Sequence, residues 1–121
     1  ILKNKSKILT KKIDTILLDI NLDNKSLLIK LDIEGNEFKA LEGADLTIRK
    51  YSPIVIIEFS RFIFEKNNAK SYFSNFLRKN DYKIYNSKKR EVTDENIYNL
   101  IENLDYTYDT IGNYFLISME M

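Results

Sequence analysis

The sequence has no cysteine, no histidine and no tryptophan, and it has only one proline and three glycines in 121 residues. The lack of cysteine excludes disulfides, thiolate chemistry and zinc-finger sites. The lack of histidine excludes every mechanism that needs a Ser-His pair. Any acid or base in a catalytic site of this chain must therefore be Asp, Glu, Lys or Tyr.

Long apolar runs and a charge of one sign are also missing. No run approaches the roughly 20 residues that cross a bilayer, and the first residues lack the apolar core of a signal peptide, so we expect a cytoplasmic protein without membrane contact. The net charge of +1 leaves no broad positive field for nucleic acid. The one basic cluster, which comprises Lys3, Lys5, Lys7, Lys11 and Lys12, is interpreted as a solvated terminal face.

The remaining composition is that of a folded domain. Hydrophobic residues make up 44% and charged residues 31% of the chain, which is enough apolar surface for a core. The length fits one domain or a piece of one. Because the chain begins with Ile1 and not with methionine, we expect that polypeptide upstream has been left out.

Apolar runs and helical patterns alternate along the first half of the chain. Ile13 to Ile20 is predicted to be a short strand running into a turn or a helical start. The nearly continuous apolar run from Leu27 to Ile33 predicts a strand covered on both faces, as parallel strands are. Asn36 to Lys50 has helical spacing that Gly43 bends or divides, and Pro53 to Glu58 is the next strand. Strand, helix and strand in this order form a parallel crossover unit.

The second half continues the alternation. The predicted elements are a helix from Asn67 or Asn68 to Asn80, a strand from Tyr82 to Tyr85, a helix that begins at Thr93 or Asp94, and a last strand from Asn113 to Met119 that could pair with the strand before it. The predicted fold class is therefore a layered α/β fold.

Acidic residues mark the ends of the two predicted parallel strands. Asp32 and Glu34 close the first strand, and residues two apart in a strand face the same side, with Cα atoms roughly 7 Å apart. Glu58 closes the second strand at the same edge of the sheet. Carboxylates so close together can split their pKa values, which leaves one of them ready to take a proton. Gly35 allows a sharp turn, and the amides of the helix that begins near Asn36 face the same crevice.

Other interpretations of these residues stay open. The acids could simply end their strands and favour the start of the following helix. A magnesium or calcium ion held by the carboxylates is a less favoured alternative, and our prediction is a site without metal. Arg61, just after the second strand, is interpreted as an ordinary surface arginine in preference to an anion-binding one.

Three blocks of the sequence carry a family resemblance. They are Ile29-Lys30-Leu31-Asp32-Ile33-Glu34-Gly35-Asn36-Glu37, Leu41-Glu42-Gly43-Ala44 and Pro53-Ile54-Val55-Ile56-Ile57-Glu58. In residue types and spacing they resemble the FkbM family of S-adenosylmethionine-dependent methyltransferases. The resemblance implies the C-terminal half of a Rossmann-like class I methyltransferase sheet, with parallel strands, crossover helices and an antiparallel last strand.

The resemblance also implies roles for individual residues. Asp32 and Glu34 would line the crevice beside the sulfonium of S-adenosylmethionine and the methyl acceptor, and one of them would be the catalytic base. Glu58 and Asn36 would lie on the substrate side. The implied reaction is O-methylation of a hydroxyl on a sugar, a polyketide-like compound or another small molecule.

The chain departs from the family pattern in one respect. The glycine-rich strand-loop-helix that holds the cofactor is absent, because the three glycines lie at Gly35, Gly43 and Gly112. We therefore expect residues 1–121 to be a partial domain, the substrate-side half, which is active only with the missing N-terminal half and which has an unpaired apolar strand edge. The alternative is a non-catalytic, truncated α/β interaction module that pairs this edge with another chain.

Overall fold

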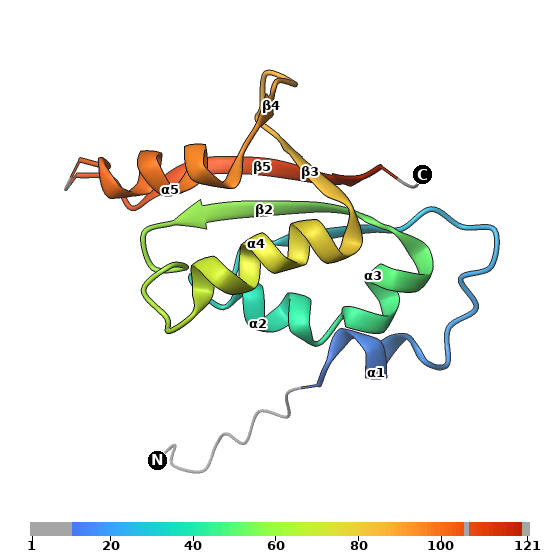
Figure 1. Cartoon of the computed structure of the whole chain (residues 1–121). Coiled ribbons are helices and arrows are strands. Elements are labelled where there is room, and N and C mark those ends of the chain that lie inside the picture. Colours follow the sequence, from blue (N-terminus) through green and yellow to red (C-terminus); the bar gives the residue numbers. More distant parts are fainter. Residues whose placement is uncertain (1–10, 106, 120–121) are drawn as a thin grey trace, which may run out of the picture.

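A computed structural model describes residues 11–105 and 107–119 of the chain. Its helices are α1 (Ile13–Leu17), α2 (Glu37–Glu42), α3 (Asp45–Tyr51), α4 (Ala69–Asn80) and α5 (Asp94–Glu102) (Figure 1). Its strands are β1 (Leu28–Leu31), β2 (Ile54–Ser60), β3 (Tyr82–Tyr85), β4 (Glu91–Val92) and β5 (Thr110–Ser118). Of the predicted basic face, Lys3, Lys5 and Lys7 lie outside the described residues, whereas Lys11 and Lys12 are exposed.

The strands form one mixed sheet in the order β1-β2-β5-β3-β4. β1 and β2 are parallel, and α2 and α3 connect them, as predicted. β5 is antiparallel to both of its neighbours, β2 and β3, so the predicted antiparallel last strand and its pairing with the strand predicted from Tyr82 to Tyr85, which is β3, are confirmed. The two-residue strand β4 was not predicted, and it pairs with β3 alone among the described strands.

Local signals explain where the helices begin and end. Gly43 divides the predicted long helix into α2 and α3, and a Cβ added there would lie 3.3 Å from the Cβ of Lys12. α5 begins with a capping box, in which the Thr93 hydroxyl accepts the N–H of Asn96 and the Asn96 side chain accepts the N–H of Thr93. Both N-terminal amides are thereby satisfied, which stabilises the helix start.

The prediction of a strand within Ile13 to Ile20 is wrong, because the segment forms helix α1 and then a turn. Ile13 and Leu17 are four residues apart and half-buried, whereas Ile16 and Leu18 are 53% and 76% exposed. This pattern gives one partly covered helix face and no alternating strand face.

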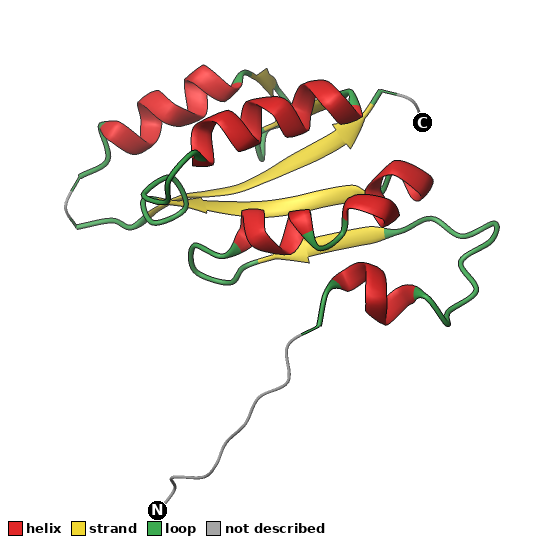
Figure 2. Ribbon diagram, turned by 60° about the horizontal axis from the view of Figure 1, so that its bottom comes forward, coloured by secondary structure: helices red, strands yellow, loops and turns green. Residues whose placement is uncertain are grey.

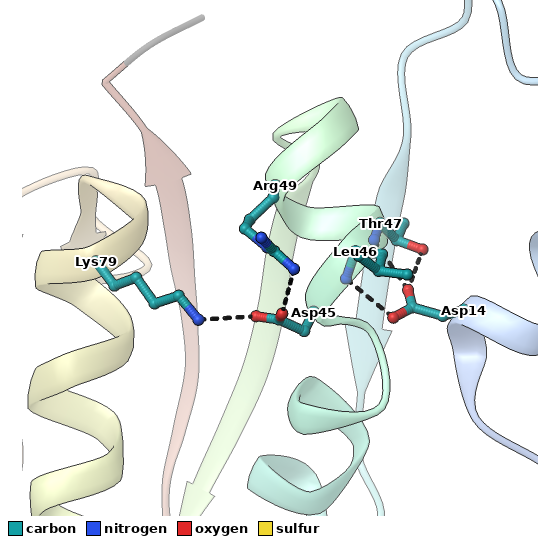
Figure 3. A network of polar contacts seen from close by, with 6 residues as sticks. All are labelled: Asp14, Asp45, Leu46, Thr47, Arg49 and Lys79. Atoms are coloured by element: carbon teal, nitrogen blue, oxygen red, sulfur yellow. Dashed lines mark hydrogen bonds and ion pairs between the residues drawn. The ribbon is translucent and has the colours of Figure 1, made fainter.

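Asp14 fixes α1 to the start of α3 (Figure 3). Its carboxylate accepts the backbone N–H of Leu46 and of Thr47, both at 2.9 Å, and the Thr47 hydroxyl at 2.6 Å. These two amides belong to the first turn of α3, which lacks a capping side chain of its own. Burial raises the pKa of Asp14, but the hydrogen bonds from Thr47 and Leu46 lower it more, so that the net pKa lies below its ordinary value of 3.8.

We expect Asp14→Ala to lower the free energy of unfolding at pH 7 by about 1–2 kcal/mol, as the loss of a helix cap does. Because the pKa is lowered in the folded protein, this contribution is complete above the ordinary value of 3.8 and is lost as the pH falls through the folded value. Urea denaturation at pH 7 and pH 3 measures the difference. The exposed Asp19 is the control, and its alanine variant should match the wild type. An Asp14→Ala effect that is equal at both pH values would contradict this assignment.

A second carboxylate links α3 to α4. Asp45 is 2.9 Å from Nη2 of Arg49 on its own helix and 3.2 Å from Nζ of Lys79 on α4 (Figure 3). All three side chains are substantially exposed, so each pair contributes less than about 1 kcal/mol.

The helices gather on one side of the sheet (Figure 2). The buried strand residues pack there against residues of α2 to α5 in one core. Its centre is an aromatic cluster, which comprises Phe38, Phe59, Phe64, Tyr72, Phe73, Tyr98 and Tyr114.

The opposite face of the sheet is only partly covered by the described residues, and we call it the open face. Lys30, Ile56, Phe115 and Tyr85 form one row across it, with Leu28 and Ile54 on one side of the row and Glu58 and Asn113 on the other. These side chains are half-buried or exposed, in alternation with the buried ones. The prediction that the first strand is covered on both faces is therefore wrong for the described chain, because its helices lie on one side.

Candidate functional site

The candidate site lies where β1 ends beside β2. The prediction that Glu58 closes the second strand is wrong, because β2 continues to Ser60 and Glu58 pairs with Asn113 within it. Leu31 pairs with Ile57, so the residues that follow them, Asp32 and Glu58, come to neighbouring positions at one edge of the sheet. This is the edge at which open α/β sheets place their ligands.

The turn after β1 carries the other predicted acid. β1 ends at Leu31, so Asp32 and Glu34 lie in the turn and not in the strand, and both are exposed. Glu34 has φ of +50°, in the left-handed region. The argument that they share a strand face is therefore wrong, although both remain close enough to Glu58 for their charges to affect it.

Glu58 is the electrostatic centre of the site. Burial raises its pKa above the ordinary value of 4.5, and the charge of Asp32, a side-chain hydrogen bond with Asp32, and the charges of Glu37 and Glu34 raise it further. Glu58 thus keeps its proton to a higher pH in the folded chain than in the unfolded chain. Its ionisation destabilises the fold as the pH rises from 4.5 through the raised value. A site of this kind favours a cation or a hydrogen-bond donor such as a hydroxyl.

Gly35 gives the turn its shape. Its φ is +101°, a conformation that side chains rarely adopt, and an added Cβ would lie 3.2 Å from the Cβ of Phe62. The next residue, Asn36, is the N-cap of α2, but its side chain makes no capping bond; its Oδ1 accepts a hydrogen bond from Nζ of Lys66 at 2.8 Å. The turn is therefore packed against the loop that follows β2.

Glu37 belongs to this site but was not among the predicted site residues. Its side chain is only 1% exposed, and its carboxylate accepts the N–H of Ile33 at 2.9 Å and of Gly35 at 2.8 Å. Its position two residues after the turn glycine is the signal that could have indicated this role, because a side chain there can bend back to the turn.

Two further residues lie just beyond Glu58. Ser60 is 7% exposed, and its Oγ has no hydrogen-bond partner within the described chain. Arg61, predicted to be an ordinary surface arginine, is half-buried and donates to the carbonyl oxygens of Asp105 at 2.9 Å and Tyr108 at 2.5 Å. Arg61 thus holds the segment before β5 at this edge of the sheet.

Two hollows lie beside the turn, and they are lined by turn residues other than the acids. One of about 720 Å³ is bounded by Ile33, Asn36 and α2, and one of about 580 Å³ by Gly35, α2 and the start of α4. Neither is lined by Asp32, Glu34 or Glu58.

Residues 11–105 and 107–119 contain neither a cluster of metal ligands nor a membrane-spanning helix. No group of three or more acidic side chains in these ranges is arranged to hold a metal ion. No helix there is long and apolar enough to cross a membrane.

An open α/β sheet with carboxylates gathered where its first strand ends beside a parallel neighbour places the chain in the class of α/β proteins that build a site at this edge. The model of one family, the methyltransferase FkbM domain, matches residues 3–108. The chain therefore belongs to the FkbM methyltransferase domain family, and the predicted resemblance is confirmed. Neither a curated protein nor a solved structure gives a significant match.

Proposed function

We propose that this chain is the substrate-side portion of an S-adenosylmethionine-dependent methyltransferase that methylates a hydroxyl of a sugar or another small molecule. The observation that carries the proposal is that Asp32 and Glu34, in the turn after β1, lie close to Glu58 of the parallel strand β2, in a chain of the FkbM family. Carboxylates attract a sulfonium cation and accept hydrogen bonds from a hydroxyl, so the donor set suits both reactants.

The residues of this chain suit the sulfonium of S-adenosylmethionine but offer nothing to hold its amino-acid end. Gly35 lies in the turn after β1, Gly43 between two helices and Gly112 in β5, and none of them belongs to a glycine-rich loop that could hold the amino-acid end of S-adenosylmethionine. The open face supports the same conclusion. We infer that further polypeptide supplies the cofactor half of the site and that the sheet is the C-terminal part of a Rossmann-like one.

The residues of this chain would do the following work. When bound, S-adenosylmethionine supplies the methyl group as an electrophilic sulfonium. Asp32 or Glu34 takes the proton of the acceptor hydroxyl, and Glu58 and Asn36 hold the acceptor by hydrogen bonds. Because methyl transfer is an in-line displacement, holding the hydroxyl oxygen in line and excluding water account for most of the expected contribution.

Calorimetry with S-adenosylmethionine tests the proposal. We expect binding by a longer version of the protein that includes a glycine-rich strand-loop-helix, and none by the 121-residue chain. Asp32→Ala in the longer version should weaken binding, because it removes a negative charge beside the sulfonium. Tight binding by the 121-residue chain alone would contradict the half-site. An upstream sequence without a glycine-rich loop would argue against the methyltransferase itself.

A second candidate function is a non-catalytic interaction module. β1 is an edge strand of the described sheet, and Leu28 at its start is 59% exposed. An exposed apolar edge can pair with a strand of another chain. Sedimentation of a monomer at all concentrations would count against pairing between copies of this chain.

A further inference from the structure

The turn between β1 and α2 has an unusual backbone. Two successive residues have positive φ, Glu34 at +50° and Gly35 at +101°. Outside glycine this region is sparsely populated, so a turn of this shape persists only where its surroundings fix it. Asp32, Ile33 and Glu34 are all exposed and cannot fix the turn by packing.

Glu37 makes the contacts that fix this turn. Its two carboxylate oxygens accept different amides, with Oε2 bonded to the N–H of Ile33 at 2.9 Å and Oε1 to that of Gly35 at 2.8 Å. One bonded amide follows Asp32 directly, and the two amides flank Glu34. A carboxylate that is 1% exposed is costly unless it is well hydrogen-bonded, and charge-assisted bonds of this kind are about twice as strong as neutral ones.

We propose that Glu37 is a positioning residue, which holds Asp32 and Glu34 beside Glu58 by binding both ends of the turn. Their catalytic roles rest on the proposed function, whereas the positioning itself does not. Glu37 is 1% exposed and both of its carboxylate oxygens bond amides of the turn, so it acts through the turn. Its place in the first turn of α2 would also suit a residue that only stabilises the helix, but both of its hydrogen bonds are made to the turn before the helix.

The variant Glu37→Asp tests the proposal, because it keeps the charge and shortens the side chain by one methylene. NMR gives two readouts on the 121-residue chain: the exchange rates of the Ile33 and Gly35 amides, and the pH midpoint of the Glu58 carboxyl. We expect at least one of the two amides to exchange about tenfold faster or more, which corresponds to the loss of one charge-assisted hydrogen bond. We also expect the Glu58 midpoint to fall towards its ordinary value of 4.5, because Asp32 and Glu34 move away from it.

Two further variants separate positioning from charge and from loss of the fold. Glu42→Asp makes the same change at an exposed position of the same helix, and it should leave both readouts unchanged. Glu37→Gln keeps the length, but its amide nitrogen cannot accept an N–H, so one of the two amides should exchange faster even if the aspartate variant does not fold.

Two results would overturn the proposal. One is a Glu37→Asp variant with unchanged amides and an unchanged Glu58 midpoint. The other is a midpoint that moves in Glu37→Gln but not in a folded Glu37→Asp, since Glu37 would then act through its charge alone. Neither readout involves methyl transfer or cofactor binding, so the outcome is independent of whether the proposed function holds.

Discussion

Asp32→Asn is expected to slow methyl transfer by about 10²–10⁴-fold, the usual contribution of a general base. Asparagine keeps the size of the side chain but cannot take a proton at neutral pH. The assay uses the version of the protein that binds S-adenosylmethionine and measures release of S-adenosylhomocysteine with a panel of sugars and other small hydroxyl compounds. Because Asp32 is also expected beside the sulfonium, the dissociation constant of the cofactor should rise at the same time.

Asp23→Asn is the matched control, because Asp23 is exposed and lies before β1, at the strand end opposite to Asp32. It removes the same charge and should leave both the rate of methyl transfer and the dissociation constant of the cofactor unchanged. Glu34→Gln identifies the base: if it slows transfer and Asp32→Asn does not, the base is Glu34. A normal rate in both variants would exclude a base from this turn.

Phe59→Ala is expected to lower the free energy of unfolding by about 3–5 kcal/mol, as the truncation of a buried aromatic residue does. Phe59 is fully buried, and its ring centroid lies 5.2 Å from that of Phe73, 5.5 Å from that of Tyr114 and 5.9 Å from that of Phe64. The residue thus joins the sheet to α4 and to the loop before it. The total free energy of unfolding of a small domain is about 5–15 kcal/mol. The variant should therefore unfold at a much lower urea concentration or fail to fold.

Two comparisons make this measurement specific. Phe62→Ala removes the same ring three residues later, where the side chain is 41% exposed, and should cost less than about 1 kcal/mol. Phe59→Leu keeps most of the volume and should cost less than Phe59→Ala. If Phe59→Ala and Phe62→Ala lowered the free energy of unfolding equally, the aromatic cluster would not be the centre of the core.

The parts of the fold that could be predicted are those with strong local signals. The unit from Leu28 to Ser60 follows from two apolar runs and from Gly43 between two helical segments. α1 was not predicted because its first-turn residue Asp14 is explained only by the amides of α3, which no local pattern reveals. That β1 is covered on one face alone by the described residues could not be predicted either, because an apolar run does not indicate on which faces helices pack.

The candidate site was predictable in outline. Parallel strands end at the same edge, so the approach of Asp32 to Glu58 followed from the order of the elements. The position of Glu34 did not follow, because the strand ends before it and its backbone is left-handed. The burial of Glu37 depends on the fold around the turn, and a charged residue after a glycine is more often exposed.

The side chains of the open face limit how far an apolar layer can extend over it. Apart from Lys30 on the edge strand, its middle is aliphatic and aromatic, whereas at the site end Glu58 and Asn113 lie side by side, with Asp32 next to them. An apolar layer can pack on Ile54, Ile56 and Phe115, but extending it over Glu58 would bury a carboxylate without compensation, at a cost of several kcal/mol. A covering layer is therefore stable only if it stops at the acids or meets them with hydrogen-bond donors. Asp32, Glu58 and Asn113 thus limit how far an apolar interface on this face can extend.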